Sequence, residues 1–154
     1  MNKTIIAVHG RAGEGKSETI KKVCEIILRD FPNAIPSTIP NYSGDILLTI
    51  QLDKIKIGFE SQGDPNSRMI YDDTIKKLAD KELSKQFGGC DIIICATRTG
   101  GMTVKKVDKI ANIYGYNTLW ISSFFSPKLN RSVLNYKAAN NIIEIVKALI
   151  IKQL

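Results

Sequence analysis

Residues Thr4–Phe31 read TIIAVHGRAGEGKSETIKKVCEIILRDF, and three structural signals follow one another in this stretch. The first segment, Thr4–His9, is short, apolar and rich in β-branched residues, which predicts a buried strand. The glycine-rich segment Gly10–Ser17 comes next. After it, apolar residues recur at spacings of three and four up to Phe31, which predicts a helix that Pro32 ends. We therefore expect a strand, a glycine-rich turn and a helix in direct succession.

The rest of the chain continues this alternation of strands and helices. After Pro32 we expect a loop over 32–44, an antiparallel hairpin of strands 45–52 and 54–60, and a polar loop over 61–68. A helix ended by Gly88 and Gly89 follows, and then a buried strand over 90–97. The last predicted elements are a helix capped by Thr103 and ended by Gly115, a strand over 117–125 and a long C-terminal helix. Such a succession predicts an α/β fold of three αβα layers, with a mostly parallel sheet and one antiparallel hairpin strand at an edge. No internal repeat or domain boundary interrupts residues 1–154, so we expect a single domain.

The composition is typical of a compact globular domain. Of the 154 residues, 44% are hydrophobic and 24% are charged, so no long stretch is committed to disorder. The formal net charge is +7, and it comes mainly from lysines that are spread over the chain. A charge of this sign favours anionic partners in general: it fits a nucleotide and it permits nucleic acid.

The cysteines and the hydropathy pattern indicate the cellular compartment. Cys24, Cys90 and Cys95 are odd in number, and the last two have opposite parity along an apolar run, so we expect them on opposite faces of the sheet. Neither a disulfide nor a zinc site is expected. The N-terminal apolar run is too short for a signal peptide, and no segment is long enough to span a membrane. These observations predict a cytoplasmic protein with no membrane partner.

The segment Gly10–Ser17, GRAGEGKS, matches the pattern G-x-x-x-x-G-K-[ST] between a predicted strand and a predicted helix. Glycines let the backbone curl so that successive N–H groups point inward, at the positive end of the following helix. Lys16 adds a full positive charge, and the Ser17 hydroxyl is placed to ligate Mg²⁺. We predict a phosphate-binding loop made by Gly10, Arg11, Ala12, Gly13, Glu14, Gly15, Lys16 and Ser17, with Glu18 directly after it.

In this segment the chain resembles the P-loop nucleoside triphosphatases and kinases. The resemblance is specific over residues 4–19 and architectural elsewhere, and Glu18 stands where many relatives have a second Ser or Thr. It implies that the domain binds ATP or another nucleoside triphosphate together with Mg²⁺. Gly13 extends the match to small-molecule kinases such as shikimate and gluconate kinases. The chain lacks the Asn/Thr-Lys-x-Asp motif that recognises guanine, which favours adenine.

A P-loop needs a second acidic group for Mg²⁺, normally at the end of a neighbouring buried strand. Glu60 ends the predicted strand 54–60 and is our candidate for this metal ligand. The segment 60–63, Glu-Ser-Gln-Gly, also resembles the Asp-x-x-Gly segment of switch-type GTPases, with glutamate in place of aspartate. That resemblance implies that Gly63 contacts the γ-phosphate and that Gln62 or Asp64 orients the attacking water.

Further candidates follow the later strands. Arg68 lies in the loop after Glu60, and Arg98 follows the strand over 90–97 at the edge where ligands bind in open α/β folds. Either guanidinium could reach a γ-phosphate or an acidic acceptor. By resemblance to P-loop kinases, the base would rest on the loop over 123–130, where the candidates are Pro127, Lys128 and Asn130. The single histidine, His9, is expected to pack beneath the loop instead of acting as a base.

Three functions fit these residues. The first is Mg²⁺-dependent ATP hydrolysis, with the loops over 32–44 and 61–74 sensing the γ-phosphate. The second is a kinase that transfers the γ-phosphate to a small anionic acceptor held near Arg68 and Arg98. The third is a non-catalytic nucleotide-binding regulator whose basic surface meets nucleic acid or a partner protein. The C-terminal helix is apolar over a wide arc, which indicates deep packing or, alternatively, a homodimer contact.

Overall fold

The computed structural model describes residues Met1–Leu154, which form an α/β fold of six strands and five helices. The strands are β1 (Thr4–His9), β2 (Ile35–Pro36), β3 (Leu47–Leu52), β4 (Ile55–Glu60), β5 (Ile92–Thr97) and β6 (Asn117–Ser122). The helices are α1 (Lys16–Asp30), α2 (Arg68–Tyr71), α3 (Thr74–Ala79), α4 (Met102–Tyr114) and α5 (Arg131–Ile150).

All the strands belong to one sheet, in the order β2-β3-β4-β5-β1-β6. Strands β4, β5, β1 and β6 run parallel, whereas β3 is antiparallel to β4, as the predicted hairpin requires. The expectation that the hairpin strand lies at the edge is wrong, because the two-residue strand β2 pairs with the outer side of β3. A strand of that length with a proline in it leaves almost no sequence pattern. Strand β5 separates β4 from β1, so the ends of β4 and β1 are not adjacent.

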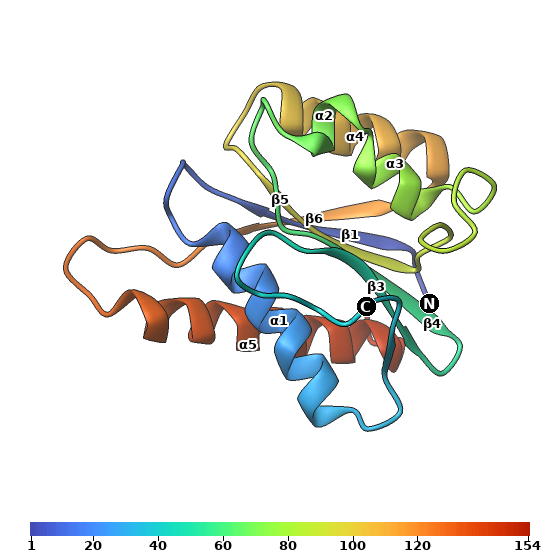
Figure 1. Ribbon diagram of the computed structural model, residues 1–154, viewed down its shortest axis with the longest axis horizontal. Coiled ribbons are helices and arrows are strands. Elements are labelled where there is room, and N and C mark those ends of the chain that lie inside the picture. The colour runs from blue at the N-terminus through green and yellow to red at the C-terminus, as the bar shows by residue number, and fades with distance from the viewer.

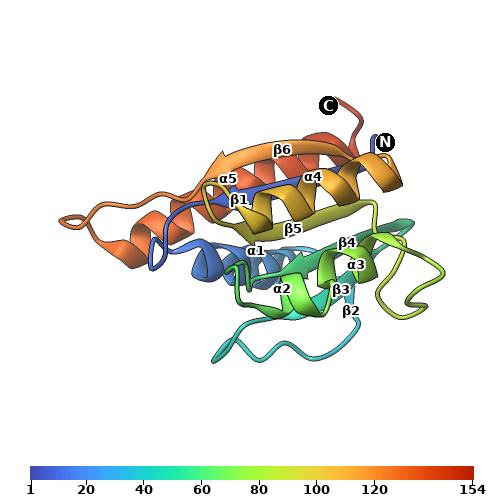
Figure 2. The ribbon, with the colours of Figure 1, turned by 90° about the horizontal axis from the view of Figure 1, so that it is seen from above.

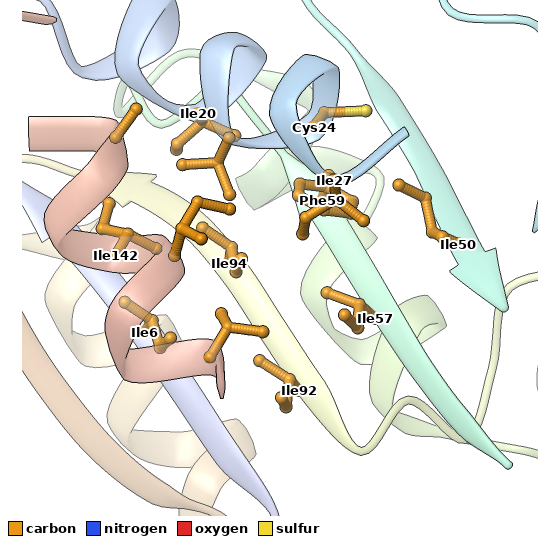
Figure 3. Close-up of a cluster of buried hydrophobic side chains, with 14 of the residues drawn as sticks. Ile6, Ile20, Cys24, Ile27, Ile50, Ile57, Phe59, Ile92, Ile94 and Ile142 are labelled. Atoms are coloured by element: carbon orange, nitrogen blue, oxygen red, sulfur yellow. The ribbon is translucent and has the colours of Figure 1, made fainter. Parts of the chain in front are cut away.

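Helices cover both faces of the sheet, as a three-layer α/β architecture requires. In Figure 1 helices α2, α3 and α4 lie above the sheet and α1 and α5 below it, and Figure 2 shows the same layers from above. Twenty buried apolar residues fill the space between the sheet and α1 with α5. Figure 3 shows side chains of this cluster, among them Ile6, Ile94 and Phe59 from the sheet and Ile20 and Ile142 from the helices. A second cluster of 13 buried residues lies under α2, α3 and α4.

Strand β5 contributes residues to both clusters, because its successive side chains point to opposite faces of the sheet. Ile92 and Ile94 face the first cluster, whereas Ile93 and Cys95 face the second, and all four side chains are buried. Neighbouring side chains of a strand point to opposite faces, so a nearly continuous apolar run is needed where both faces are covered. The expectation that Cys90 and Cys95 lie on opposite faces is wrong, because Cys90 precedes β5 and does not follow its alternation.

Several predicted boundaries differ from the structure, and strands β3, β4 and β5 begin at Leu47, Ile55 and Ile92, one or two residues later than predicted. The helix predicted to run to Gly88 ends at Ala79, because the Asp80 carboxylate accepts the N–H groups of the next turn and diverts the chain. Thr103 is not the cap of α4, which is Gly101. The strand predicted over 117–125 stops at Ser122, and β6 has only β1 as a neighbour.

Helix α5 uses most of its apolar arc for packing within the domain. Ile142, Ile143, Val146 and Leu149 are buried against the sheet and α1. A homodimer through this helix stays a prediction. Taken together, the helices include none with the length and apolar character needed to cross a bilayer. The three cysteines are free and buried.

Candidate functional site

The glycine-rich loop joins the end of β1 to the start of α1. Gly13 and Gly15 have φ values of 73° and 84°, in the left-handed region that glycine tolerates best. Gly15 is the N-cap of α1, and no side chain caps this helix. The first-turn N–H groups of a helix have no partner within the helix, and the helix dipole makes this end positive. The loop therefore presents uncapped donors at a positive helix end, which is the arrangement that binds an anion.

Lys16 folds back across this loop. Its Nζ donates hydrogen bonds to the carbonyl oxygens of Gly10 and Arg11, at 2.7 and 2.9 Å, and the residue is only 7% exposed. Burial lowers the pKa of Lys16, and the charge of Arg98 lowers it further, although nearby carboxylates act in the opposite direction. A buried ammonium held only by neutral carbonyls gains from an anion placed against it. The Lys16 ammonium group is therefore already positioned to bind a negatively charged ligand.

The Ser17 hydroxyl meets an acidic residue that the sequence did not single out. Its Oγ donates to Asp45 Oδ1 at 2.6 Å, and Ser61 Oγ donates to the same oxygen at 2.8 Å. Burial raises the pKa of Asp45, but the two serine hydrogen bonds and the charges of Arg68 and Lys21 outweigh it, so the pKa lies below its ordinary value. Asp45 therefore stays ionised beside Ser17. A hydroxyl and a carboxylate oxygen are ligands that Mg²⁺ accepts.

These residues line a cavity of about 350 Å³ that no hydrophobic side chain enters. Four carboxylates border it, those of Glu14, Glu18, Asp45 and Asp64, against two cations, Lys16 and Arg131. The remaining lining residues are Gly13, Gly15, Ser17, Ser61, Gln62 and Gly63. A highly charged anion would be repelled by this excess of carboxylates unless a divalent cation came with it. The charge balance thus fits a metal-bound polyphosphate better than a bare one.

Glu60 is placed differently from what the strand-end argument implied. Its side chain is fully buried and does not border the cavity. Arg68 Nε donates to both Glu60 carboxylate oxygens, at 3.2 and 3.0 Å, and Arg68 Nη2 lies 2.8 Å from Oε1. This pair raises the pKa of Arg68. The pair therefore ties the end of β4 to the start of α2, and neither residue borders the cavity.

Gln62, Gly63 and Asp64 do border the cavity. The Gln62 side chain accepts the backbone N–H of Arg68 at 3.2 Å, so its carbonyl is already occupied. A Cβ at Gly63 would collide with the Ala96 carbonyl at the end of β5, which makes glycine obligatory there. Asp64 Oδ1 accepts from Arg98 Nε at 2.9 Å, and 58% of the Asp64 side chain is exposed. Asp64 and Arg98 are therefore a solvent-accessible pair at the cavity.

The start of α5 contributes a residue that was not among the predicted site residues. Arg131, the first residue of α5, borders the cavity, lies beside Gly13 and stacks over the Phe125 ring, with 5.7 Å between the guanidinium carbon and the ring centroid. Its position as the first residue of the helix after the last strand was the only available signal. Pro127 and Lys128 are exposed and do not border the cavity, and Asn130 caps α5 by accepting the N–H of Val133.

The other members of the predicted loop take supporting positions. Gly10 is buried, and its N–H donates to the Thr97 carbonyl at the end of β5. Arg11 and Ala12 are exposed, and the Glu14 carboxylate accepts the Arg11 N–H at 3.1 Å. His9 is half-buried and borders a separate cavity of about 220 Å³ together with Thr99, Val104 and Trp120. The loop is thus held by backbone and local contacts, and its residues Gly13–Ser17 border the open cavity.

Comparison with protein-family models, with curated proteins and with solved structures gave no match for this chain. The conclusions on function therefore rest on the residues and their geometry.

Proposed function

We propose that this protein binds ATP with Mg²⁺ through the loop Gly10–Ser17 and hydrolyses the phosphoanhydride bond between the β- and γ-phosphates, which leaves ADP and free phosphate. The single observation that carries the proposal is the loop itself. A left-handed Gly15 opens the uncapped end of α1, and the buried Lys16 ammonium has only neutral carbonyl partners. A polar cavity in front of a positive helix end supports a phosphate ligand.

In this proposal, some residues of the chain bind the phosphates and others hold the metal ion. The N–H groups at the start of α1 donate to phosphate oxygens, and Lys16 exchanges its carbonyl partners for the β- and γ-phosphates. Ser17 and Asp45 would hold Mg²⁺, whose charge offsets that of the phosphates and of the surrounding carboxylates. We assign this metal role to Asp45 in preference to Glu60, because Arg68 occupies both oxygens of the Glu60 carboxylate.

Two features favour hydrolysis over transfer to an acceptor. Arg68 and Arg98, the guanidinium groups expected to clamp an acceptor, are each paired with a carboxylate of this chain. Asp64 borders the cavity and is accessible to water, so it is the group best situated to orient an attacking water molecule. Hydrolysis is the function that these pairings support.

The nucleobase would lie outside the cavity, because no apolar side chain lines it. Phe125 and Arg131 form a stacked pair beside Gly13, and 45% of Phe125 is exposed. An exposed aromatic ring with a guanidinium is a surface on which a purine can stack. We assign the base to this side of the loop.

The cellular compartment is a separate part of the proposal. The three cysteines are free and buried, which agrees with a reducing, cytoplasmic setting.

Calorimetry on Lys16→Ala tests the proposal. Wild-type protein should bind ATP in the presence of Mg²⁺, and the variant should lose that binding. Lys109→Ala, which removes an equal charge from the exposed face of α4, serves as the control and should bind normally. Equal affinity of Lys16→Ala and wild type would refute the phosphate site. Release of free phosphate in a single-turnover assay with labelled ATP separates hydrolysis from binding without turnover.

A further inference from the structure

A second polar cavity, of about 420 Å³, lies at the opposite end of the sheet from the phosphate loop. It is bordered by the turn between β3 and β4, by the start of β4, by the residues after α3 and by Asp91, which precedes β5. The lining residues are Gln51, Lys54, Lys56, Lys81, Glu82, Lys85, Gly88, Gly89 and Asp91, none of them hydrophobic. Figure 1 shows the loop after α3 on the right and the loop between β1 and α1 on the left.

The wall of this cavity is a constrained piece of backbone. The Lys56 N–H donates to Asp91 Oδ2 at 2.9 Å, and the Asp91 N–H donates to the Lys56 carbonyl at 2.8 Å. Lys56 Nζ donates to the Gly88 carbonyl at 3.0 Å and ties β4 to the turn after α3. A Cβ at Gly88 would collide with backbone carbonyls, and Gly89 has a φ of 77°. Both positions therefore require glycine, and the turn keeps its shape.

The charged side chains around this cavity are available to a ligand, because no ion pair neutralises them. Lys54, Lys56, Lys81 and Lys85 face this space together with Glu82 and Asp91, yet none of the six takes part in an ion pair. The aliphatic part of Lys81 lies over Gly89, which directs its long side chain along the wall. Lysine ammonium groups are suited to phosphate as point charges. Four of them against two carboxylates leave the cavity net positive.

The carboxylates indicate what else the ligand carries. Asp91 uses one oxygen on the Lys56 N–H, and its other oxygen makes no hydrogen bond. The Gln51 amide nitrogen donates to the carbonyls of Asp53 and Ile55, so its oxygen remains an acceptor. Free acceptors beside ammonium groups match a ligand with hydroxyl donors as well as phosphate. The cavity volume is in the range of about 300–1,000 Å³ that holds small molecules.

We propose that this second cavity binds a small phosphorylated polyhydroxy compound of the sugar-phosphate class. The lysines hold the phosphate, and Asp91, Glu82 and Gln51 accept from the hydroxyls. The site cannot supply an acceptor to the phosphate loop. Thr4 pairs with Ile92 at this end of the strands while His9 leads into the loop at the other, roughly 17 Å away at about 3.3 Å per residue. The ligand is therefore a second one, bound independently of the nucleotide.

Amide NMR titration of the full chain tests this site. Glucose 6-phosphate, ribose 5-phosphate, glycerol 3-phosphate and inorganic phosphate are added separately at constant ionic strength, in the Lys16→Ala background to silence the phosphate loop. At least one sugar phosphate should shift the amides of Gly88 and Gly89 saturably, at least tenfold more tightly than inorganic phosphate. The added substitutions Lys81→Ala and Lys85→Ala should abolish those shifts, whereas Lys105→Ala with Lys109→Ala, an equal loss of charge on α4, should leave them.

Several outcomes would overturn the assignment. These are shifts that grow linearly with every compound, inorganic phosphate binding as tightly as all the sugar phosphates, or unchanged shifts in the Lys81→Ala, Lys85→Ala protein. ATP binding, measured with Lys16 intact, should be the same with and without the substitutions at Lys81 and Lys85. A failure at the second cavity therefore leaves the nucleotide proposal standing, and a failure of ATP binding leaves this one testable.

Discussion

Replacing Asp45 by asparagine removes one negative charge from the cavity in front of the loop Gly10–Ser17. It keeps an oxygen that can accept the hydrogen bonds from Ser17 and Ser61, which measure 2.6 and 2.8 Å to Oδ1. Asp45 is an exposed residue, so its electrostatic contribution is screened by water. The fold should therefore tolerate the change, and the effect should fall on the metal-bound ligand.

The expected magnitude follows from Coulomb's law. Two unit charges about 4 Å apart in water interact with about 1 kcal/mol, so a carboxylate that holds a divalent cation through a water at that distance contributes about 2 kcal/mol. A difference of about 2 kcal/mol corresponds to roughly a 30-fold change in affinity. Asp45→Asn should weaken the binding of Mg²⁺-ATP by about this factor. In the absence of Mg²⁺ the sign reverses, because the variant removes a charge that repels the triphosphate, and ATP should bind equally well or slightly better.

Calorimetric titration with ATP, in Mg²⁺ and in chelator, measures both affinities on the same protein. Asp108→Asn is the matched control, since Asp108 is exposed on α4 and does not border the cavity. Urea unfolding checks that Asp45→Asn retains wild-type stability. The metal role of Asp45 is refuted if the variant shows the wild-type ratio between the two affinities, or if both affinities fall together.

Three further predictions follow. Glu60→Gln should lower the free energy of unfolding, measured with urea, by about 2–3 kcal/mol; this is less than for a fully buried ion pair because the Arg68 side chain is 26% exposed. Arg131→Ala should weaken ATP binding by about tenfold in calorimetry, because it removes the guanidinium on which the base stacks, with unchanged stability because Arg131 is exposed and makes no ion pair. Burial raises the pKa of Cys24 to about 11 and that of Cys90 to about 12, so at about pH 8 a thiol reagent should label neither until the protein unfolds.

A specific result would contradict each of these three predictions. Unchanged stability of Glu60→Gln combined with slow ATP turnover would return Glu60 to the catalytic role predicted from the strand end. Normal ATP affinity of Arg131→Ala would remove the start of α5 from the site, and Lys137→Ala, further along the same helix, controls for the change in charge. Rapid labelling of a cysteine in the folded protein would show that its thiol is exposed.

The parts of the candidate site that lie close together in sequence were the ones that could be predicted. Gly13, Gly15, Lys16 and Ser17 sit within one turn, and the strand before them and the helix after them are set by local hydropathy. Glycine at a left-handed φ and a helix that starts directly after it are local properties, so a short motif carries them. The bounds of β1 were predicted for the same reason.

Contacts between distant segments were beyond prediction. Asp45 and Ser17 are 28 residues apart, and their contact depends on how the segment before β3 passes the start of α1. Glu60 ends its strand as predicted, but β5 lies between β4 and β1, and Arg68 forms an ion pair with the Glu60 carboxylate. The sequence predicted the neighbours β3 and β4 from their hairpin, but the apolar pattern does not distinguish the possible orders of the parallel strands, because each order satisfies the same pattern.

By itself the sequence determined the α/β class, the glycine-rich loop between β1 and α1, and the buried character of β5, because these follow from hydropathy period, glycine conformation and chain length. The tertiary structure alone decided the strand order, the pairing of Ser17 with Asp45, the engagement of Glu60 by Arg68 and the approach of Arg131 to Gly13. Those contacts arise where elements far apart in the chain pack against one another. Packing selects among arrangements that local propensity leaves equal.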